Sequence, residues 1–196
     1  MINVTQLNKS KILSEMEINM EPVKRLDREL VYEGSIINMY KDTVMTQDGN
    51  IGKWDFIGHK GAAAVIPVTA DGKLIMVKQY RNALDRFTIE IPAGGKEPKE
   101  DFKTCAAREL EEETGYKSDD LEFLISIQTT VAFCNERIDV FVARNLIRTQ
   151  QHLDDDEFVE IEEYSIDELL NMMFEGRLQD GKTLAAISAY KIKFCK

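Results

Sequence analysis

The chain has 196 residues, of which 43% are hydrophobic, so it can bury a sizeable core and its bulk is not intrinsically disordered. It carries 25 basic and 35 acidic residues, for a formal net charge of −10. Because nucleic acids and anionic membranes attract clustered Lys and Arg, this balance argues against both partners. The length suits one domain, and we expect residues 1–196 to form it without an internal linker.

The cysteines and the N-terminus indicate the compartment. Three cysteines without a Cys-x-x-Cys pair are typical of reduced thiols, and two histidines far apart argue against a zinc site. The N-terminus has no continuous apolar stretch of the kind found in secretory signals, and no apolar run approaches the roughly 20 residues of a membrane helix. We therefore expect a soluble, cytoplasmic protein.

The first half of the chain has mainly strand character. Residues 1–25 are polar and mixed, and we expect them to form an extension to which no role is assigned. Strands are predicted at 30–32, 36–39, 41–45, 52–57, 62–69, 73–79 and 87–91. Asp-Gly dipeptides favour hairpin turns, one at 48–50 and a second at 70–72, which would join the strands at 62–69 and 73–79.

The second half mixes helices with strands. Apolar residues recur at three- and four-residue spacing over 101–114, which predicts a helix ended by Gly115. Strands are predicted at 121–130, 136–143 and 158–163, and helices at about 166–175, with Ser165 as N-cap, and about 182–194. This order of elements indicates an α+β fold rather than a regular βαβ alternation.

The central helix carries a group of carboxylates. Glu109, Glu112 and Glu113 stand at i, i+3 and i+4, so their side chains project from one face, and Arg108 is placed to pair with Glu112. Like charges on one face repel each other unless a cation lies among them, and hard oxygen ligands suit Mg²⁺ or Mn²⁺. The alternative is a solvated, glutamate-rich helix surface.

The spacing around these glutamates extends to a longer motif. Its positions are Gly94, Glu100, REL at 108–110, EE at 112–113 and GY at 115–116, with five, seven, one and one residues between them. Residues 94–116 thereby resemble the Nudix box. The resemblance implies a Nudix fold, in which a mixed β-sheet lies between helices and an N-terminal antiparallel sub-sheet precedes it. It also implies hydrolysis of a nucleoside diphosphate linked to another moiety, with Mg²⁺ or Mn²⁺ as cofactor.

The resemblance assigns roles to residues of the box. Glu109, Glu112 and Glu113 match the glutamates that bind metal, and the backbone carbonyl of Ala93 matches a further ligand. Arg108 matches the arginine that orients the glutamates. We count Arg108 and Glu112 among the catalytic residues.

Segments outside the box resemble the ADP-ribose and ADP-sugar pyrophosphatase subgroup, namely KQYR at 78–81 and EIPAG at 90–94. Arg81 matches an arginine that contacts the phosphate–ribose part of the substrate, which suits a guanidinium. Glu90 either supports the metal site or is a buried partner of Arg81. Trp54 matches a tryptophan that stacks on adenine, and its alternative is a core residue.

An acidic loop supplies the candidate base. The segment DEFVEI at 156–161 resembles one whose glutamate activates or orients the attacking water, so Glu157 is the candidate and Asp155 the second choice. The alternative is a solvated acidic loop. Two departures from the subgroup concern the backbone: Val131 and Ala132 replace a proline and a glycine, which leaves strict preference for ADP-ribose open, and Lys99 stands where glycine is frequent.

The resemblance therefore predicts a small-molecule nucleoside diphosphate as substrate, with ADP-ribose converted to AMP and ribose 5-phosphate. The alternatives are another ADP-sugar, a GDP-sugar or NADH, and a domain that binds ADP-ribose without cutting it. The subgroup also implies a homodimer in which residues 28–57 are exchanged between subunits.

Overall fold

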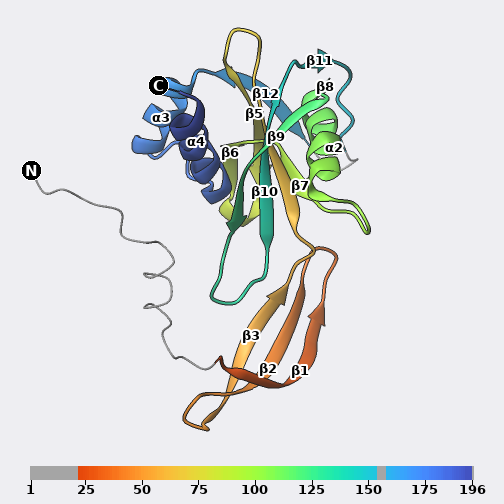
Figure 1. Cartoon of the computed structure of the whole chain (residues 1–196), viewed down its shortest axis with the longest axis vertical. Coiled ribbons are helices and arrows are strands. Elements are labelled where there is room, and N and C mark those ends of the chain that lie inside the picture. Colours follow the sequence, from red (N-terminus) through yellow and green to blue (C-terminus); the bar gives the residue numbers. More distant parts are fainter. Residues whose placement is uncertain (1–21, 154–157, 196) are drawn as a thin grey trace, which may run out of the picture. The chain divides into compact units, whose positions relative to one another are not determined.

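The computed structural model describes residues 22–153 and 158–195, which form two compact units, one up to Phe56 and one from Ile57 onward (Figure 1). The first unit is an antiparallel sheet in the order β1-β2-β3, with β1 at Lys24–Glu33, β2 at Asn38–Met45 and β3 at Ile51–Gly58. Thr46 and Asn50 close the turn between β2 and β3 by a hydrogen bond of 2.9 Å from N to O. Gly49 has φ 81°, which glycine adopts without strain, so the predicted first hairpin is confirmed.

One arginine organises the face of this small sheet. Arg28 donates from Nε and Nη2 to the two carboxylate oxygens of Asp42, each at 2.6 Å. Its guanidinium also lies 3.8 Å from the centroid of the Phe56 ring. Because Arg28 and Asp42 are opposite each other in the β1–β2 ladder, their ion pair supports this register.

The second unit contains two main sheets. One has the order β7-β4-β10-β9, with β4 parallel to β10 and antiparallel to β7. The other has the order β12-β5-β6 and is antiparallel. Their bounds are β4 Ala62–Pro67, β5 Leu74–Arg81, β6 Arg86–Glu90, β7 Ala93–Gly95, β9 Asp120–Gln128, β10 Arg137–Arg144 and β12 Val159–Tyr164. A 3-10 turn η1 (Asn82–Leu84) and a short pair, β8 (Tyr116–Lys117) with β11 (Ile147–Arg148), complete the strand regions.

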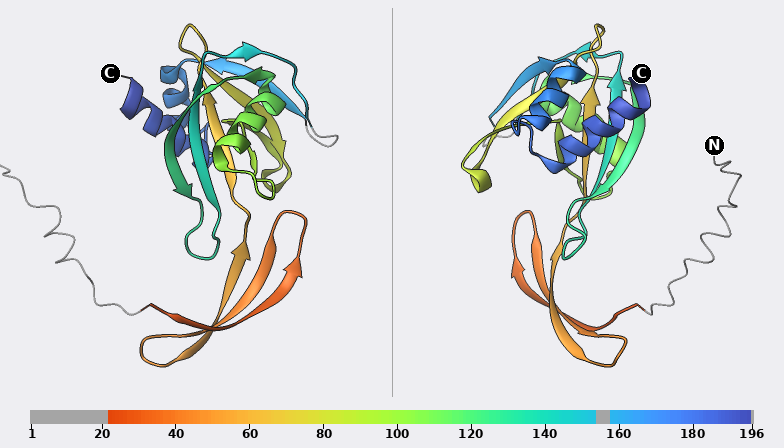
Figure 2. Two further views of the ribbon diagram at one scale, coloured as in Figure 1. Left: turned by 45° about the vertical axis from the view of Figure 1, so that its right-hand side comes forward. Right: turned by 90° about the vertical axis from the view of Figure 1, so that its left-hand side faces the viewer.

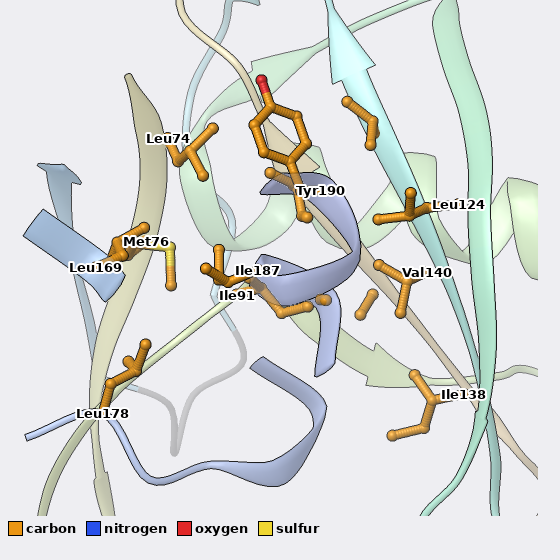
Figure 3. Packing of buried hydrophobic residues seen from close by; sticks show 14 of the residues in the cluster. Leu74, Met76, Ile91, Leu124, Ile138, Val140, Leu169, Leu178, Ile187 and Tyr190 are labelled. Carbon is orange, nitrogen blue, oxygen red and sulfur yellow. The ribbon is translucent and has the colours of Figure 1, made fainter. Parts of the chain in front are cut away.

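Helices cover both sides of these strands (Figure 2). They are α2 (Phe102–Thr114), α3 (Ile166–Phe174) and α4 (Gly181–Phe194). Along β4, Ala63 and Val65 pack with α2, whereas Ala64 and Ile66 belong to the larger core. In this core, Leu169 of α3 and Ile187 of α4 lie among Met76, Ile91 and Val140 (Figure 3). Because every residue of β4 is buried, this strand has an apolar run rather than an alternating pattern. The expected α+β fold, with a mixed sheet between helices, is confirmed.

Local signals set the helix ends. Asp101 accepts the N–H of Thr104 at 2.8 Å before α2, and Gly115 ends this helix at φ 68°. Ser165 and Glu168 form a capping box before α3, so the predicted N-cap is confirmed. Among the described residues, no helix has the length and apolar character needed to cross a membrane.

The turn of the second predicted hairpin is present, but the prediction that its two strands pair with each other is wrong. Thr69 donates to the carbonyl of Lys73 at 2.9 Å, and one isolated bridge joins Val68 and Leu74. The two strands then separate, because β4 pairs with β10 and β7 whereas β5 pairs with β12 and β6. β4 and the first four residues of β5 are apolar and buried on both faces, which suits a central strand of a covered sheet.

Candidate active site

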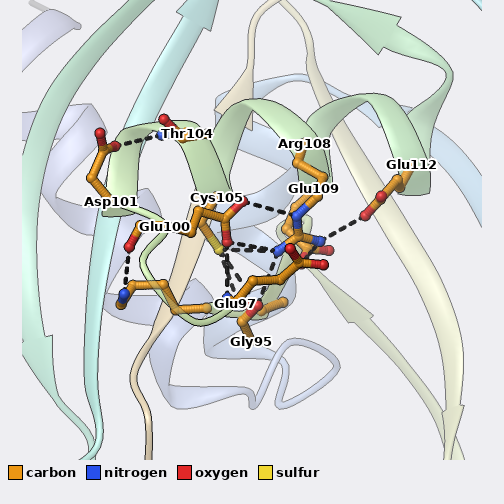
Figure 4. A network of polar contacts seen from close by, with 11 residues as sticks. Gly95, Glu97, Glu100, Asp101, Thr104, Cys105, Arg108, Glu109 and Glu112 are labelled. Carbon is orange, nitrogen blue, oxygen red and sulfur yellow. Dashed lines mark hydrogen bonds and ion pairs between the residues drawn. The ribbon is translucent and has the colours of Figure 1, made fainter.

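Arg108 joins the carboxylates of the central helix to the loop before it (Figure 4). Its Nη1 donates to Glu109 Oε1 at 2.7 Å and to Glu112 Oε2 at 2.8 Å, so the predicted pairing with Glu112 is confirmed. Its Nε and Nη2 bind both oxygens of Glu100 at 3.0 and 3.1 Å, and Nη2 also donates to the carbonyl of Gly95. The hydrogen bond to Glu100 is the main cause that raises the pKa of Arg108, which keeps the guanidinium charged.

Glu109 lies against a glycine. Its carboxylate is nearly buried and occupies the space that a Cβ on Gly94 would fill. β7 brings Gly94 there, because it pairs with β4 while α2 packs on the same strand. Glycine at this position is therefore required for the carboxylate to reach the loop backbone.

Glu113 reaches the residue just before the box. Its Oε2 accepts the backbone N–H of Ala93 at 2.9 Å, and the side chain is nearly buried. The structure thus brings Ala93 together with Glu113, through the N–H of Ala93, while Arg108 brings Glu109 and Glu112 together. Lys99, in the loop between β7 and α2, has φ 71°, which explains why glycine suits its position.

The donors fit a hard divalent cation in kind. Carboxylates of α2 contact β7 at two points, because Glu113 accepts the N–H of Ala93 and Glu109 fills a space at Gly94 that only glycine leaves open. In the described part of the chain, no group of three or more Asp, Glu, His or Cys side chains is arranged so that it could hold a metal ion by itself. A cation here would complete its shell with water and substrate phosphates, as Mg²⁺ usually does.

A second charged group surrounds Glu90. Arg81 donates to it through Nε at 2.8 Å and Nη2 at 2.7 Å, Thr88 donates at 2.7 Å, and Lys182 forms a further ion pair. Burial favours the neutral carboxyl, but the hydrogen bonds from Arg81 and the charge of Lys182 outweigh it and lower the pKa of Glu90 to about 2. Glu90 is therefore the buried partner of Arg81, which is one of its two expected roles.

Lys182 is the member of this group that no sequence motif indicates. It lies in the first turn of α4, after the N-cap Asp180, where a positive charge opposes the helix dipole. A lysine at this position, where an acidic residue is favoured, hints that a carboxylate lies nearby. The sequence contains no sign that the carboxylate is Glu90, 92 residues away.

The remaining candidates are Trp54 and the acidic residues Glu157 and Asp155. Trp54 belongs to β3 in the first unit. It is 51% exposed, so it is not a core residue. Glu157 and Asp155 lie outside the described residues, so the candidate base remains a prediction. Val131, at the position of the subgroup's proline, is exposed in the loop between β9 and β10.

Comparisons with known proteins agree with this geometry. The family described as NUDIX domain matches residues 58–187. An ADP-ribose pyrophosphatase of Bacillus subtilis (strain 168) and a methanol dehydrogenase activator of Bacillus methanolicus are each 38% identical over 172 residues, which cover 87% of this chain and 93% of the relative. A crystal structure of an ADP compounds hydrolase matches with a TM-score of 0.80 at 17% identity, over 90% of this chain and 98% of that chain.

Proposed function

Because the chain belongs to the Nudix hydrolase family, we propose that it hydrolyses the diphosphate bond of ADP-ribose to give AMP and ribose 5-phosphate. The observation that carries the proposal is the contact of Arg108 with Glu109 and Glu112, in the same unit as Glu113 and the half-buried, positively charged Arg81. The 38% identity to an ADP-ribose pyrophosphatase supports this choice of substrate among the nucleoside diphosphate sugars.

The chain's own groups divide the work. Glu109, Glu112, Glu113 and the Ala93 carbonyl would hold Mg²⁺ or Mn²⁺, which when bound neutralises charge on the diphosphate and lowers the pKa of a water molecule. Arg108 fixes the directions of Glu109 and Glu112 through its Nη1. Arg81 binds a phosphate oxygen through its guanidinium, with Glu90 holding one edge of that group.

Two further roles belong to the same proposal. Glu157 accepts or steers the proton of the attacking water. Trp54 stacks on the adenine, for which its exposure leaves the indole face available.

We also propose that residues 1–196 form one functional domain and that the protein is cytoplasmic. Two copies form a homodimer in which the subunits exchange residues 28–57. Apolar side chains of β1 support this, because Leu30, Val31 and Tyr32 are all exposed. Burial of these side chains by a second copy would remove the exposed apolar surface. Sedimentation equilibrium measures the mass directly, and a monomer at micromolar concentration would contradict the proposal.

A substrate panel tests the activity. ADP-ribose, another ADP-sugar, a GDP-sugar and NADH are assayed at equal concentration with Mg²⁺, with Mn²⁺ and with EDTA. We expect fastest cleavage of ADP-ribose and reversible loss of turnover in EDTA. Faster cleavage of another substrate would change the assignment, and binding of ADP-ribose without phosphate release would indicate the non-catalytic alternative.

A matched pair of variants tests the glutamates. Glu112→Gln removes a carboxylate charge from the face that Arg108 organises, and we expect turnover to be lost while the protein stays folded. Glu111→Gln makes the same change one residue earlier on α2, about 100° around the helix, and should leave turnover intact. Full activity of Glu112→Gln would contradict the proposed metal site.

A further inference from the structure

We propose that Lys182 is a positioning residue for the diphosphate group of the substrate: by sharing the charge of Glu90, it leaves Arg81 able to bind a phosphate oxygen. The inference deepens the proposed function and rests on it. It concerns a residue on the last helix, outside the Nudix box and outside the segments that resemble the pyrophosphatase subgroup.

Lys182 and Arg81 contact the same carboxylate, and Lys182 is the more buried of the two. Its ammonium pairs with Glu90 and lies 3.0 Å from Asp180 Oδ2. The side chains of Glu90 and Lys182 are 3% and 11% exposed, whereas that of Arg81 is 41% exposed. Of the two cations on this carboxylate, therefore, Arg81 is the one that solvent and ligands can reach, and Lys182 is the one that stays inside.

The hydrogen bonds leave part of Arg81 available. Glu90 binds Nε and Nη2, which form one edge of the guanidinium, and Nη1 is directed away from that edge. The hydrogen bond to Glu90 is the main cause that raises the pKa of Arg81, and the charges of Asp180 and Glu113 act in the same direction. An anion bound beside the glutamate face would meet this guanidinium.

The end of α4 is fixed to the strand that carries Glu90. Thr183, fully buried, accepts the backbone N–H of Ile91 at 3.0 Å and donates to Asp180 at 2.6 Å. Lys182, next to Thr183, is thus held at a constant distance from the end of β6. The unfavourable position of a cation at a helix N-terminus is offset by the carboxylates of Glu90 and Asp180.

The direction of the effect follows from charge sharing. A diphosphate bound at Nη1 shares the charge of Arg81 with Glu90, and with Lys182 present Glu90 keeps a second cation. Without Lys182, Arg81 is the only cation pairing with Glu90 among the described residues, so charge shared with a diphosphate leaves the buried carboxylate less compensated. Removal of Lys182 should therefore weaken substrate binding, and the glutamate face that carries out the chemistry should be unaffected.

The experiment compares Lys182→Met with Lys191→Met. Lys191 lies on the same helix but forms a surface pair with Asp167. Calorimetry with ADP-ribose in EDTA gives Kd, and steady-state assays with Mg²⁺ give KM and kcat. For Lys182→Met we expect Kd and KM to rise about ten-fold and kcat to stay within about two-fold, the pattern of lost ground-state binding; for Lys191→Met we expect no change. Lys182→Arg, which keeps the charge, should recover most of the binding.

A double-mutant cycle tests whether Lys182 acts through Glu90. In a Glu90→Gln background, Lys182→Met should weaken binding by less than about two-fold, because the charge that Lys182 shares is gone. Additive effects, or a Lys182→Met variant that loses kcat with unchanged KM and Kd, would overturn the proposal. Circular dichroism checks folding, and Lys182→Gln replaces Lys182→Met if the latter does not fold.

The two proposals fail separately. If the wild type neither binds nor cleaves ADP-ribose, the proposed function is wrong. Kd for inorganic pyrophosphate, measured with wild type, Lys182→Met and Lys191→Met, then decides the role of Lys182 by itself. Equal pyrophosphate affinity in all three proteins would overturn it.

Discussion

The carboxylate of Glu109 occupies the position that a side chain on Gly94 would need. The contact links the helix that carries the glutamates to the strand that precedes the box, and it forms because β4 supports both elements. An added methyl group at this position must displace the carboxylate, since the β7 backbone is held by its ladder with β4.

Gly94→Ala should therefore lower both activity and stability. The displaced end of Glu109 is a flexible side chain, so we expect the free energy of unfolding to fall by about 2 kcal/mol through its weakened bond to Arg108, and kcat/KM to fall at least about ten-fold. Gly95→Ala is the control, because a Cβ there meets nothing within 4 Å. Equal activities of the two variants would argue against a functional position for Glu109.

Arg108→Met should destabilise the box as well as inactivate it. The variant leaves three carboxylates, those of Glu100, Glu109 and Glu112, without their shared cation. The cluster is partly exposed, so we expect a loss of about 2 kcal/mol in urea unfolding, below the range for fully buried pairs. Lys103→Met, on an exposed part of α2, should change stability by less than about 0.5 kcal/mol.

Glu90 should contribute to stability in a pH-dependent manner. Its pKa is lowered from 4.5 to about 2 in the folded state, so its contribution is complete above about pH 4.5 and disappears as the pH falls through about 2. The shift corresponds to about 3 kcal/mol. In urea unfolding between pH 6 and pH 2, the stability difference between wild type and Glu90→Gln should shrink by about this amount as the pH falls. Parallel curves would show that Glu90 is not held in its ionised form.

Lys99→Gly should stabilise the loop of the box. Lys99 has φ 71°, which costs an L-residue with a Cβ about 1 kcal/mol or more, whereas glycine adopts it freely. Part of the gain is offset by the greater entropy of glycine in the unfolded chain, so we expect a net increase of about 0.5 kcal/mol. Lys103→Gly, inside α2, should have the opposite sign. A decrease in both variants would contradict the strain at position 99.

Features encoded by neighbouring residues were predictable. The helix expected at 101–114 is observed at Phe102–Thr114, because its N-cap Asp101 and its terminal Gly115 act within one turn of the residues they cap. The pairing of Arg108 with Glu112 follows from helical spacing alone. β7 was not predicted, because three residues after Pro92 have no strand pattern, and only β4 as a partner makes them a strand.

Residues close together along the chain encode the helix that carries the glutamates, the caps that end it and the motif that identifies the family. The tertiary structure decided that β4 and β5 enter different sheets, and that Lys182 meets Glu90. An Asp-Gly turn specifies a reversal of direction, but the partner of a strand depends on what packs against both of its faces. Likewise, a buried charge selects its counter-ion by distance in space, and 92 residues of intervening chain leave no trace of that choice in the sequence.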